Sequence, residues 1–192
     1  MHATRMSHTD TGVLVIDMQE KLLPIVPGRS DLLEQITFLV EIAQKLGMTV
    51  QATEQYPKGL GPTVAPLAHL IPQRPAKTGF SCCDAPGVVD TFHREARPKI
   101  VLCGIETHVC VLNTALDLLA HNFRVYVAVD AVGSRFAQDH TVALRRMEQA
   151  GVIPTTVETC VFEWMGGASH PNFKEISRLV QERMKAMGGL PS

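Results

Sequence analysis

The sequence predicts an α/β fold in which a mostly parallel sheet is covered by helices on both faces. Short, β-branched apolar segments, such as 11–19, alternate with longer segments whose apolar residues recur at helical spacing, such as 31–46. The 192 residues are 45% apolar, which is enough for one substantial core. We therefore expect a single domain over 1–192, with 1–10 as a flexible N-terminal extension.

The first expected strand, "TGVLVIDMQ" at 11–19, ends in an acid. This is typical of a buried parallel strand that delivers a polar side chain at its carboxyl end. Further strands are expected at 48–53, 99–105, 124–132 and 152–162, and a short one within "AKTGFSCCD" at 76–84.

Helical apolar spacing places helices between these strands, at 31–46, 88–95, 108–120, 139–151 and 172–187. The first of them stops at Gly47. The segment 54–75 carries seven prolines and glycines, so it is expected to be mostly irregular, with at most a short helix around 64–70. Long irregular segments of this kind are usually functional loops.

Composition excludes several classes of partner. The net charge is −1 and the charges are mixed along the chain, so the basic surface that nucleic acid requires is not expected. Residues 1–10 lack the apolar middle of a secretion signal, and no apolar run approaches the roughly 20 residues that span a bilayer. The five cysteines are an odd number without scaffold spacing, which indicates free thiols. We expect a cytoplasmic protein with no membrane or nucleic-acid partner.

Three chemically capable residues each follow an expected strand: Asp17, Lys77 and Cys110. The carboxyl ends of parallel strands lie at one edge of a sheet, so these side chains should meet there. A cysteine reacts as its thiolate, which a nearby cation and a helix amino terminus favour. An adjacent carboxylate can take the thiol proton and return it to a leaving amine, and free backbone N–H groups can bind an oxyanion. This set of groups is suited to acyl transfer.

Each of the three residues also has an ordinary structural interpretation. A partly buried cysteine is more often inert core than nucleophile, Asp17 could cap a turn, and a single lysine is usually a surface residue. The shared position of all three at strand ends is stronger evidence for a functional site than the presence of any one of them.

Five motifs carry a resemblance that covers nearly the whole chain: "VLVIDMQ", "AKTGFS", "VLCGIETHVCVLNTALDLL", "VAVDAVGSR" and "ALRRMEQAG". In this order they resemble the isochorismatase-like cysteine hydrolase superfamily, and "TEQYPKGLG" with "ASHPNFKEI" is similar to its isochorismatase domain-containing subgroup. The resemblance implies a Rossmann-like three-layer α/β sandwich with a six-stranded, mostly parallel sheet. It also implies a homo-oligomer, a dimer or larger.

The resemblance assigns roles to particular residues. It implies a catalytic triad of Asp17, Lys77 and Cys110, a cis peptide bond between Ile105 and Glu106, and oxyanion donors at the backbone N–H groups of Glu106 and Cys110. Members with this cysteine are typically amidohydrolases of small amides or ureides, whereas members that hydrolyse isochorismate lack it. Nicotinamidases hold a metal through an aspartate and histidines after the second strand, where this chain has "ATEQYPKGLG". We therefore expect no metal and no cofactor, and the adjacent Cys82 and Cys83 also lack zinc-ligand spacing.

Weaker expectations concern the surroundings of the triad. Gln19, Tyr56 and Phe80 are candidate substrate-binding residues, although structural packing explains Tyr56 and Phe80 about equally well. Trp164 is a further pocket candidate without a defined role. His108 lies two residues from Cys110 on a helix, so the two side chains should point apart, which favours a loop or interface position for His108.

The sequence predicts a cofactor-independent cysteine hydrolase of a small amide- or ureide-like substrate, acting through a thioester. Two alternatives remain open at this stage. One is an inactive scaffold or interaction protein of the same fold, and the other, which the balanced charge disfavours, is a nuclease.

Overall fold

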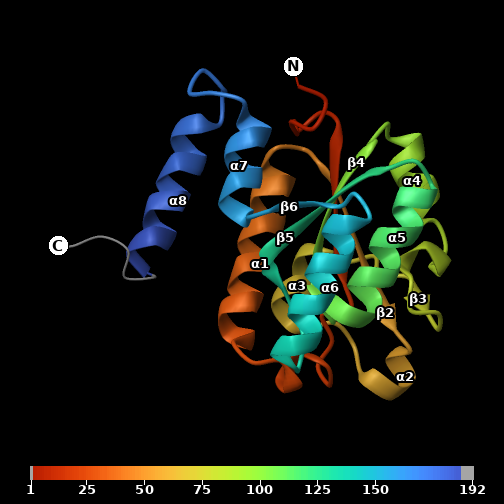
Figure 1. The fold of residues 1–192 in the computed structure, drawn as a ribbon. Coiled ribbons are helices and arrows are strands. Elements are labelled where there is room, and N and C mark those ends of the chain that lie inside the picture. The colour runs from red at the N-terminus through yellow and green to blue at the C-terminus, as the bar shows by residue number, and fades with distance from the viewer. Residues whose placement is uncertain (1, 187–192) are drawn as a thin grey trace.

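A computed structural model describes residues 2–186 and contains a single six-stranded parallel sheet (Figure 1). The strand order is β3-β2-β1-β4-β5-β6, and every named pair is parallel. The predicted α/β class with a six-stranded sheet is therefore confirmed. The strands are β1 (Thr11–Ile16), β2 (Thr49–Gln55), β3 (Ala76–Lys77), β4 (Lys99–Ile105), β5 (Arg124–Gly133) and β6 (Ile153–Thr155).

Helices cover both faces of the sheet (Figure 1). Val13 and Val15 of β1 pack into the apolar cluster on one face, and Leu14 and Ile16 pack into the cluster on the other, as the period of two in a strand requires. The first face is covered by α1 (Arg29–Lys45), α3 (Ala65–Leu70), α7 (Val157–Met165) and α8 (Phe173–Ala186). The second is covered by α4 (Val88–Arg94), α5 (Leu112–Ala120) and α6 (Ala137–Gln149).

Two segments differ from the sequence-based expectations. The expected strand at 152–162 ends at Thr155, and α7 begins at Val157. Thr156 caps this helix, because its side chain accepts a hydrogen bond from the backbone N–H of Thr159, and Gly166 ends it in a left-handed conformation. The cap outweighs the strand preference of the β-branched residues in this segment.

The expected irregular segment 54–75 contains α2 (Pro57–Leu60) as well as α3. The end of the expected last helix at 187 lies outside the described residues.

The N-terminal segment also differs from the flexible extension that we expected. Met6 is fully buried, and its backbone N–H donates a 2.8 Å hydrogen bond to Glu163 Oε2 in α7. Lys99 and Tyr126, at the amino ends of β4 and β5, donate to the carbonyl oxygens of Arg5 and Thr4. These contacts attach the segment to the edge of the sheet opposite the strand ends that bear the predicted site.

Gly104, near the end of β4, allows β4 and β1 to approach closely just before that site. Its φ is 117°, and a Cβ placed there would lie 2.1 Å from the carbonyl oxygen of Ile16. We expect Gly104→Ala to lower the free energy of unfolding by about 3 kcal/mol or more, because the strand must shift and the backbone conformation is unfavourable. Urea denaturation measures the change. Gly167→Ala is the matched control, since a Cβ there meets no atom within 4 Å, and equal losses in the two variants would contradict the prediction.

Candidate active site

Asp17, Lys77 and Cys110 meet at the carboxyl edge of the sheet. Asp17 directly follows β1, Lys77 ends β3, and Cys110 lies in the turn that follows β4. Lys77 Nζ lies 2.7 Å from Asp17 Oδ2 and 3.6 Å from Cys110 Sγ. The side chains of Asp17 and Lys77 are fully buried, so the structure places a desolvated ion pair against a thiol.

Asp17 is held in position from two sides. Its backbone is in the left-handed region, with φ of 49°, where the chain leaves β1 and turns into the site. Lys77 contacts Oδ2, and the hydroxyl of Thr53 donates a 2.8 Å hydrogen bond to Oδ1. Thr53 also lies 3.2 Å from Cys82 Sγ, which places a second buried thiol behind the carboxylate. Both carboxylate oxygens therefore have a fixed partner.

The three N–H donors of the Lys77 ammonium all have acceptors within the site. Burial alone would lower the pKa of Lys77, but the neighbouring Cys82, Asp17 and Cys110 together raise it above its ordinary value, so the ammonium is charged. Besides Asp17 and Cys110, its acceptors are Gln55 Oε1 at 2.7 Å and the carbonyl oxygens of Phe80 at 3.2 Å and Gly79 at 3.4 Å.

Cys110 lies at the start of a helix, as expected, but its first turn is wider than an α-helical turn. Thr107–Val111 form a π-helical turn that continues into α5. Burial, followed by the charge of Asp17, raises the pKa of the Cys110 thiol, and Lys77 only partly opposes this. Desolvation of the sulfur thus outweighs the nearby cation. The resting group is a thiol beside a carboxylate that can accept its proton.

The predicted cis peptide bond is present between Ile105 and Glu106. Within the described part of the chain, the backbone N–H of Glu106 has no hydrogen-bond partner. The Glu106 side chain faces away from the triad, since its Oε1 accepts from the backbone N–H of Arg135 at 3.0 Å and its Oε2 lies 3.4 Å from the Arg135 guanidinium.

Gln19 is not placed to bind substrate, because it is fully buried and its amide is already used. Its Oε1 accepts from the backbone N–H of Gln55 at 2.7 Å, and its Nε2 donates to the carbonyl oxygens of Gln55 at 3.0 Å and Gly61 at 2.6 Å. An amide side chain with both groups bonded to backbone is a structural clamp. Gln19 holds the end of β2 against the loop that follows it.

Tyr56 and Phe80 do lie beside the triad. The backbone N–H of Tyr56 donates to the carbonyl oxygen of Lys77 at 2.9 Å, and the carbonyl oxygen of Phe80 accepts from Lys77 Nζ. Their side chains are 54% and 58% exposed. Core packing is thus excluded for both rings, which remain candidates for contacting substrate.

Two other candidates lie apart from the triad. Trp164 is buried in the core cluster of α1 and α7, on the face of the sheet opposite Cys110, because its helix packs there. His108 Nδ1 lies 3.0 Å from Ser134 Oγ and its Nε2 lies 3.8 Å from Asp139 Oδ2. It therefore pairs with the β5–α6 connection and not with Cys110.

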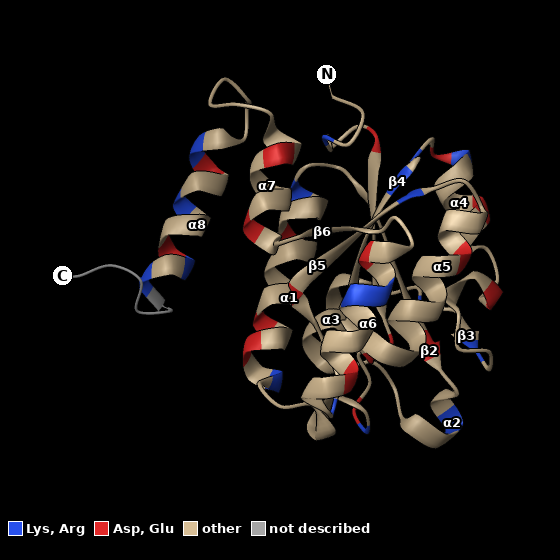
Figure 2. Cartoon of the chain, in the orientation of Figure 1, with Lys and Arg blue, Asp and Glu red and all other residues tan. Residues whose placement is uncertain are grey.

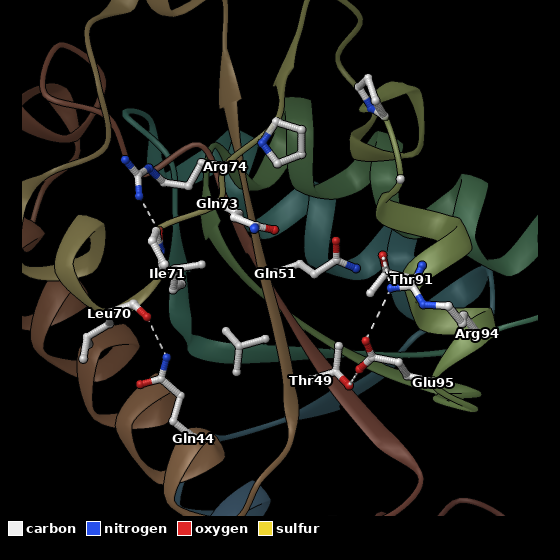
Figure 3. Close-up of a pocket in the computed structure, with 15 residues that line it drawn as sticks. Gln44, Thr49, Gln51, Leu70, Ile71, Gln73, Arg74, Thr91, Arg94 and Glu95 are labelled. Atoms are coloured by element: carbon white, nitrogen blue, oxygen red, sulfur yellow. Dashed lines mark hydrogen bonds and ion pairs between the residues drawn. The ribbon is translucent and has the colours of Figure 1, made fainter.

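A large cavity lies apart from Asp17, Lys77 and Cys110 (Figure 3). It has a volume of about 740 Å³ and lies along the outer edge of β2, lined by residues such as Gln44, Gln51, Arg74 and Glu95. Asp17, Lys77 and Cys110 do not line it.

Among residues 2–186, no cluster of three or more histidine, cysteine or acidic side chains is arranged to hold a metal ion. Within the same residues, no helix is long and apolar enough to cross a bilayer.

Two residues of the site were not assigned a role from sequence: Thr53, which contacts Asp17, and Gln55, which contacts Lys77. Both are on β2, two residues apart and next to its carboxyl end, so their side chains leave the same face of the strand. Two polar side chains on the same face at the carboxyl end of a strand are the sequence pattern that could have indicated these two residues.

Comparison with known proteins identifies close relatives. A family model described as the isochorismatase domain matches residues 11–159. Isochorismatase domain-containing protein 2 of Bos taurus is 42% identical over 173 residues, which are 88% of this chain and 82% of that protein. A solved structure described as the MAR1 ribonuclease of Caenorhabditis elegans is 39% identical, covers 93% of both chains and superposes with a TM-score of 0.86. YcaC of Pseudomonas aeruginosa shares the fold at 23% identity, with a TM-score of 0.83 over 95% of this chain and 98% of that one.

Proposed function

Because the chain belongs to the isochorismatase family of hydrolases, we propose that it is a cysteine-dependent hydrolase of a small, uncharged amide- or ureide-like substrate. One observation carries the proposal: Lys77 Nζ contacts both Asp17 Oδ2 and Cys110 Sγ in a buried site. A nucleophile, a proton acceptor and a charge-stabilising cation then lie within one hydrogen-bonded group.

The arrangement accounts for each proton in the reaction. Asp17 takes the proton from Cys110 Sγ as the sulfur attacks the substrate carbonyl carbon, and the carbonyl oxygen becomes an oxyanion. The backbone N–H groups of Glu106 and Cys110 are the proposed donors to that oxyanion. Asp17 then gives its proton to the leaving nitrogen as the C–N bond breaks, which leaves a thioester on Cys110. Asp17 next takes a proton from water as the water oxygen attacks the thioester carbon. When the C–S bond breaks, Asp17 returns that proton to the sulfur, which restores the thiol and the carboxylate.

The charges at the site favour an uncharged substrate. Lys77 already contacts one carboxylate, one amide oxygen and two carbonyl oxygens, and Arg135 is paired with Glu106. A substrate carboxylate or phosphate would have to break one of these pairs. The exposed rings of Tyr56 and Phe80 instead offer apolar contact to a neutral substituent.

A screen of small amides, ureides and esters, with intact-mass detection of an adduct, tests the proposal. We expect at least one compound to be turned over and to leave an acyl group that maps to Cys110. If a broad screen yields turnover without a Cys110 adduct in the wild type or in a slowed variant, the thioester route is wrong. If Cys110 is also unreactive toward small alkylating reagents over the whole pH range, the inactive scaffold becomes the better description.

A ribonuclease is the second candidate, because a 39% identical solved structure carries that description. Positions of Lys and Arg are interspersed with positions of Asp and Glu along the helices that Figure 2 shows, which is unlike the clustering of basic residues in many nucleic-acid-binding proteins. Degradation of a labelled RNA by wild-type protein, and its loss in Cys110→Ala and Asp17→Asn purified in parallel, would establish nuclease activity at this site. Equal degradation by all three preparations would identify a contaminant.

A further inference from the structure

We propose that Gln55 is a positioning residue whose neutral amide holds the Lys77 ammonium between Asp17 and Cys110 without adding a second negative charge. The inference rests on the hydrolase proposed above and assigns to it a residue outside the triad.

The Gln55 amide has one orientation that satisfies its neighbours. Its Oε1 lies 2.7 Å from Lys77 Nζ, and its Nε2 donates a 2.9 Å hydrogen bond to the carbonyl oxygen of Thr78. Reversing the amide would set its NH₂ group against an ammonium and its oxygen against a carbonyl oxygen, and both contacts are repulsive. The acceptor therefore faces Lys77, at the same distance as the carboxylate of Asp17 on the other side.

The backbone of Gln55 is fixed as firmly as its side chain. Gln55 pairs with Lys77 in the parallel register of β2 and β3, so the two side chains start from neighbouring positions across the sheet. The amide of Gln19 bonds both the N–H and the carbonyl oxygen of Gln55. Gln19 therefore fixes the backbone of Gln55, and the side chain of Gln55 in turn fixes the position of the Lys77 ammonium.

The neutrality of Gln55 matters when the thiol proton moves. In the resting site, Lys77 and Asp17 carry opposite charges and Cys110 is neutral. After proton transfer, Asp17 is neutral, and the Lys77 ammonium is the cation that stabilises the thiolate. A carboxylate at position 55 would offset the positive charge of Lys77 at that moment. The thiolate would then lose the stabilisation that the cation provides.

Alkylation of Cys110 by iodoacetamide tests this without knowledge of the substrate. The rate in Gln55→Glu, Gln55→Met and wild type is measured between about pH 6 and pH 9, with the modified residue mapped by mass spectrometry. Because burial and Asp17 raise the pKa of the Cys110 thiol, the wild-type rate should increase with pH across this range. We expect Gln55→Glu to react about tenfold more slowly at each pH, which corresponds to one pKa unit. Gln55→Met should react two- to threefold more slowly, since it loses the hydrogen bond but adds no charge.

The melting temperature separates positioning from a structural role. Gln55→Glu keeps an acceptor for Lys77 but loses the donor to the Thr78 carbonyl oxygen, a loss that Gln55→Met shares. It should therefore melt no lower than Gln55→Met, although its thiol reacts more slowly. Gln51→Glu is the matched control, because it adds the same charge to the same strand at a residue whose amide bonds the carbonyl oxygen of Val88. We expect its Cys110 rate to equal that of the wild type.

Each outcome decides the inference. A wild-type Cys110 rate in Gln55→Glu would overturn it and leave the hydrolase intact, provided that wild-type Cys110 reacts. If Gln55→Glu fails to fold, a wild-type rate in Gln55→Met overturns the inference in the same way. If wild-type Cys110 does not react at any pH, the proposed hydrolase fails, and the role of Gln55 fails with it.

Discussion

Replacement of Cys110 by serine is expected to lower kcat on any identified substrate by roughly a thousandfold or more, and to remove the acyl adduct. The hydroxyl of serine is a far weaker acid than a thiol, and the hydrolases that use serine activate it with an imidazole, which has no counterpart among Asp17, Lys77 and Cys110. Steady-state kinetics and intact-mass analysis measure the two effects. The fold should be retained, because serine is smaller than cysteine and polar partners are present around the site.

Cys83→Ser is the matched control for this experiment. Cys83 is the half-buried neighbour of Cys82, and it makes no hydrogen bond to Asp17, Lys77 or Cys110. We expect this variant to keep kcat within about twofold of the wild type, since a partly exposed substitution away from the reacting groups has a small effect. Activity in Cys110→Ser that approaches that of Cys83→Ser would show that the reaction proceeds without the proposed nucleophile.

The topology explains why the proximity of Asp17, Lys77 and Cys110 could be predicted from sequence. Asp17 and Lys77 are 60 residues apart along the chain, and Lys77 and Cys110 are 33 apart. Each nevertheless lies at or after the carboxyl end of a strand of one parallel sheet. In such a sheet all carboxyl ends lie at one edge, so alternation of strands and helices is enough to bring the three together.

Properties that depend on side-chain direction were harder to predict. Gln19 follows a strand end just as Asp17 does, but its amide turns toward the backbone of Gln55 and Gly61. The sequence does not specify that direction. The direction in which the pKa of Cys110 shifts could not be predicted for a related reason: a helix start and a lysine both favour a thiolate, whereas the degree of burial that opposes it follows from packing. Likewise, the β-branched residues of 152–162 predicted a strand where α7 forms, because the hydrogen bond of the Thr156 cap favours a helix there.

Removal of the charge on Lys77 should destabilise the protein strongly. In Lys77→Met the buried carboxylate of Asp17 loses its cation, and an unpaired buried charge costs about 3–5 kcal/mol in the free energy of unfolding. Methionine fills a similar apolar volume, so the loss reports on charge more than on packing. Urea denaturation at neutral pH measures it.

The double variant Lys77→Met with Asp17→Asn separates the ion pair from the rest of the site. Asparagine keeps an oxygen that can accept from Thr53, and the site no longer holds a buried charge. We therefore expect the double variant to recover most of the stability lost in Lys77→Met. It should remain inactive, because it lacks both the proton acceptor and the cation. A double variant as unstable as Lys77→Met would show that methionine at position 77 disrupts packing. In that case the contact between Lys77 and Asp17 would contribute little to folding, and the pair would be retained for the chemistry of Cys110.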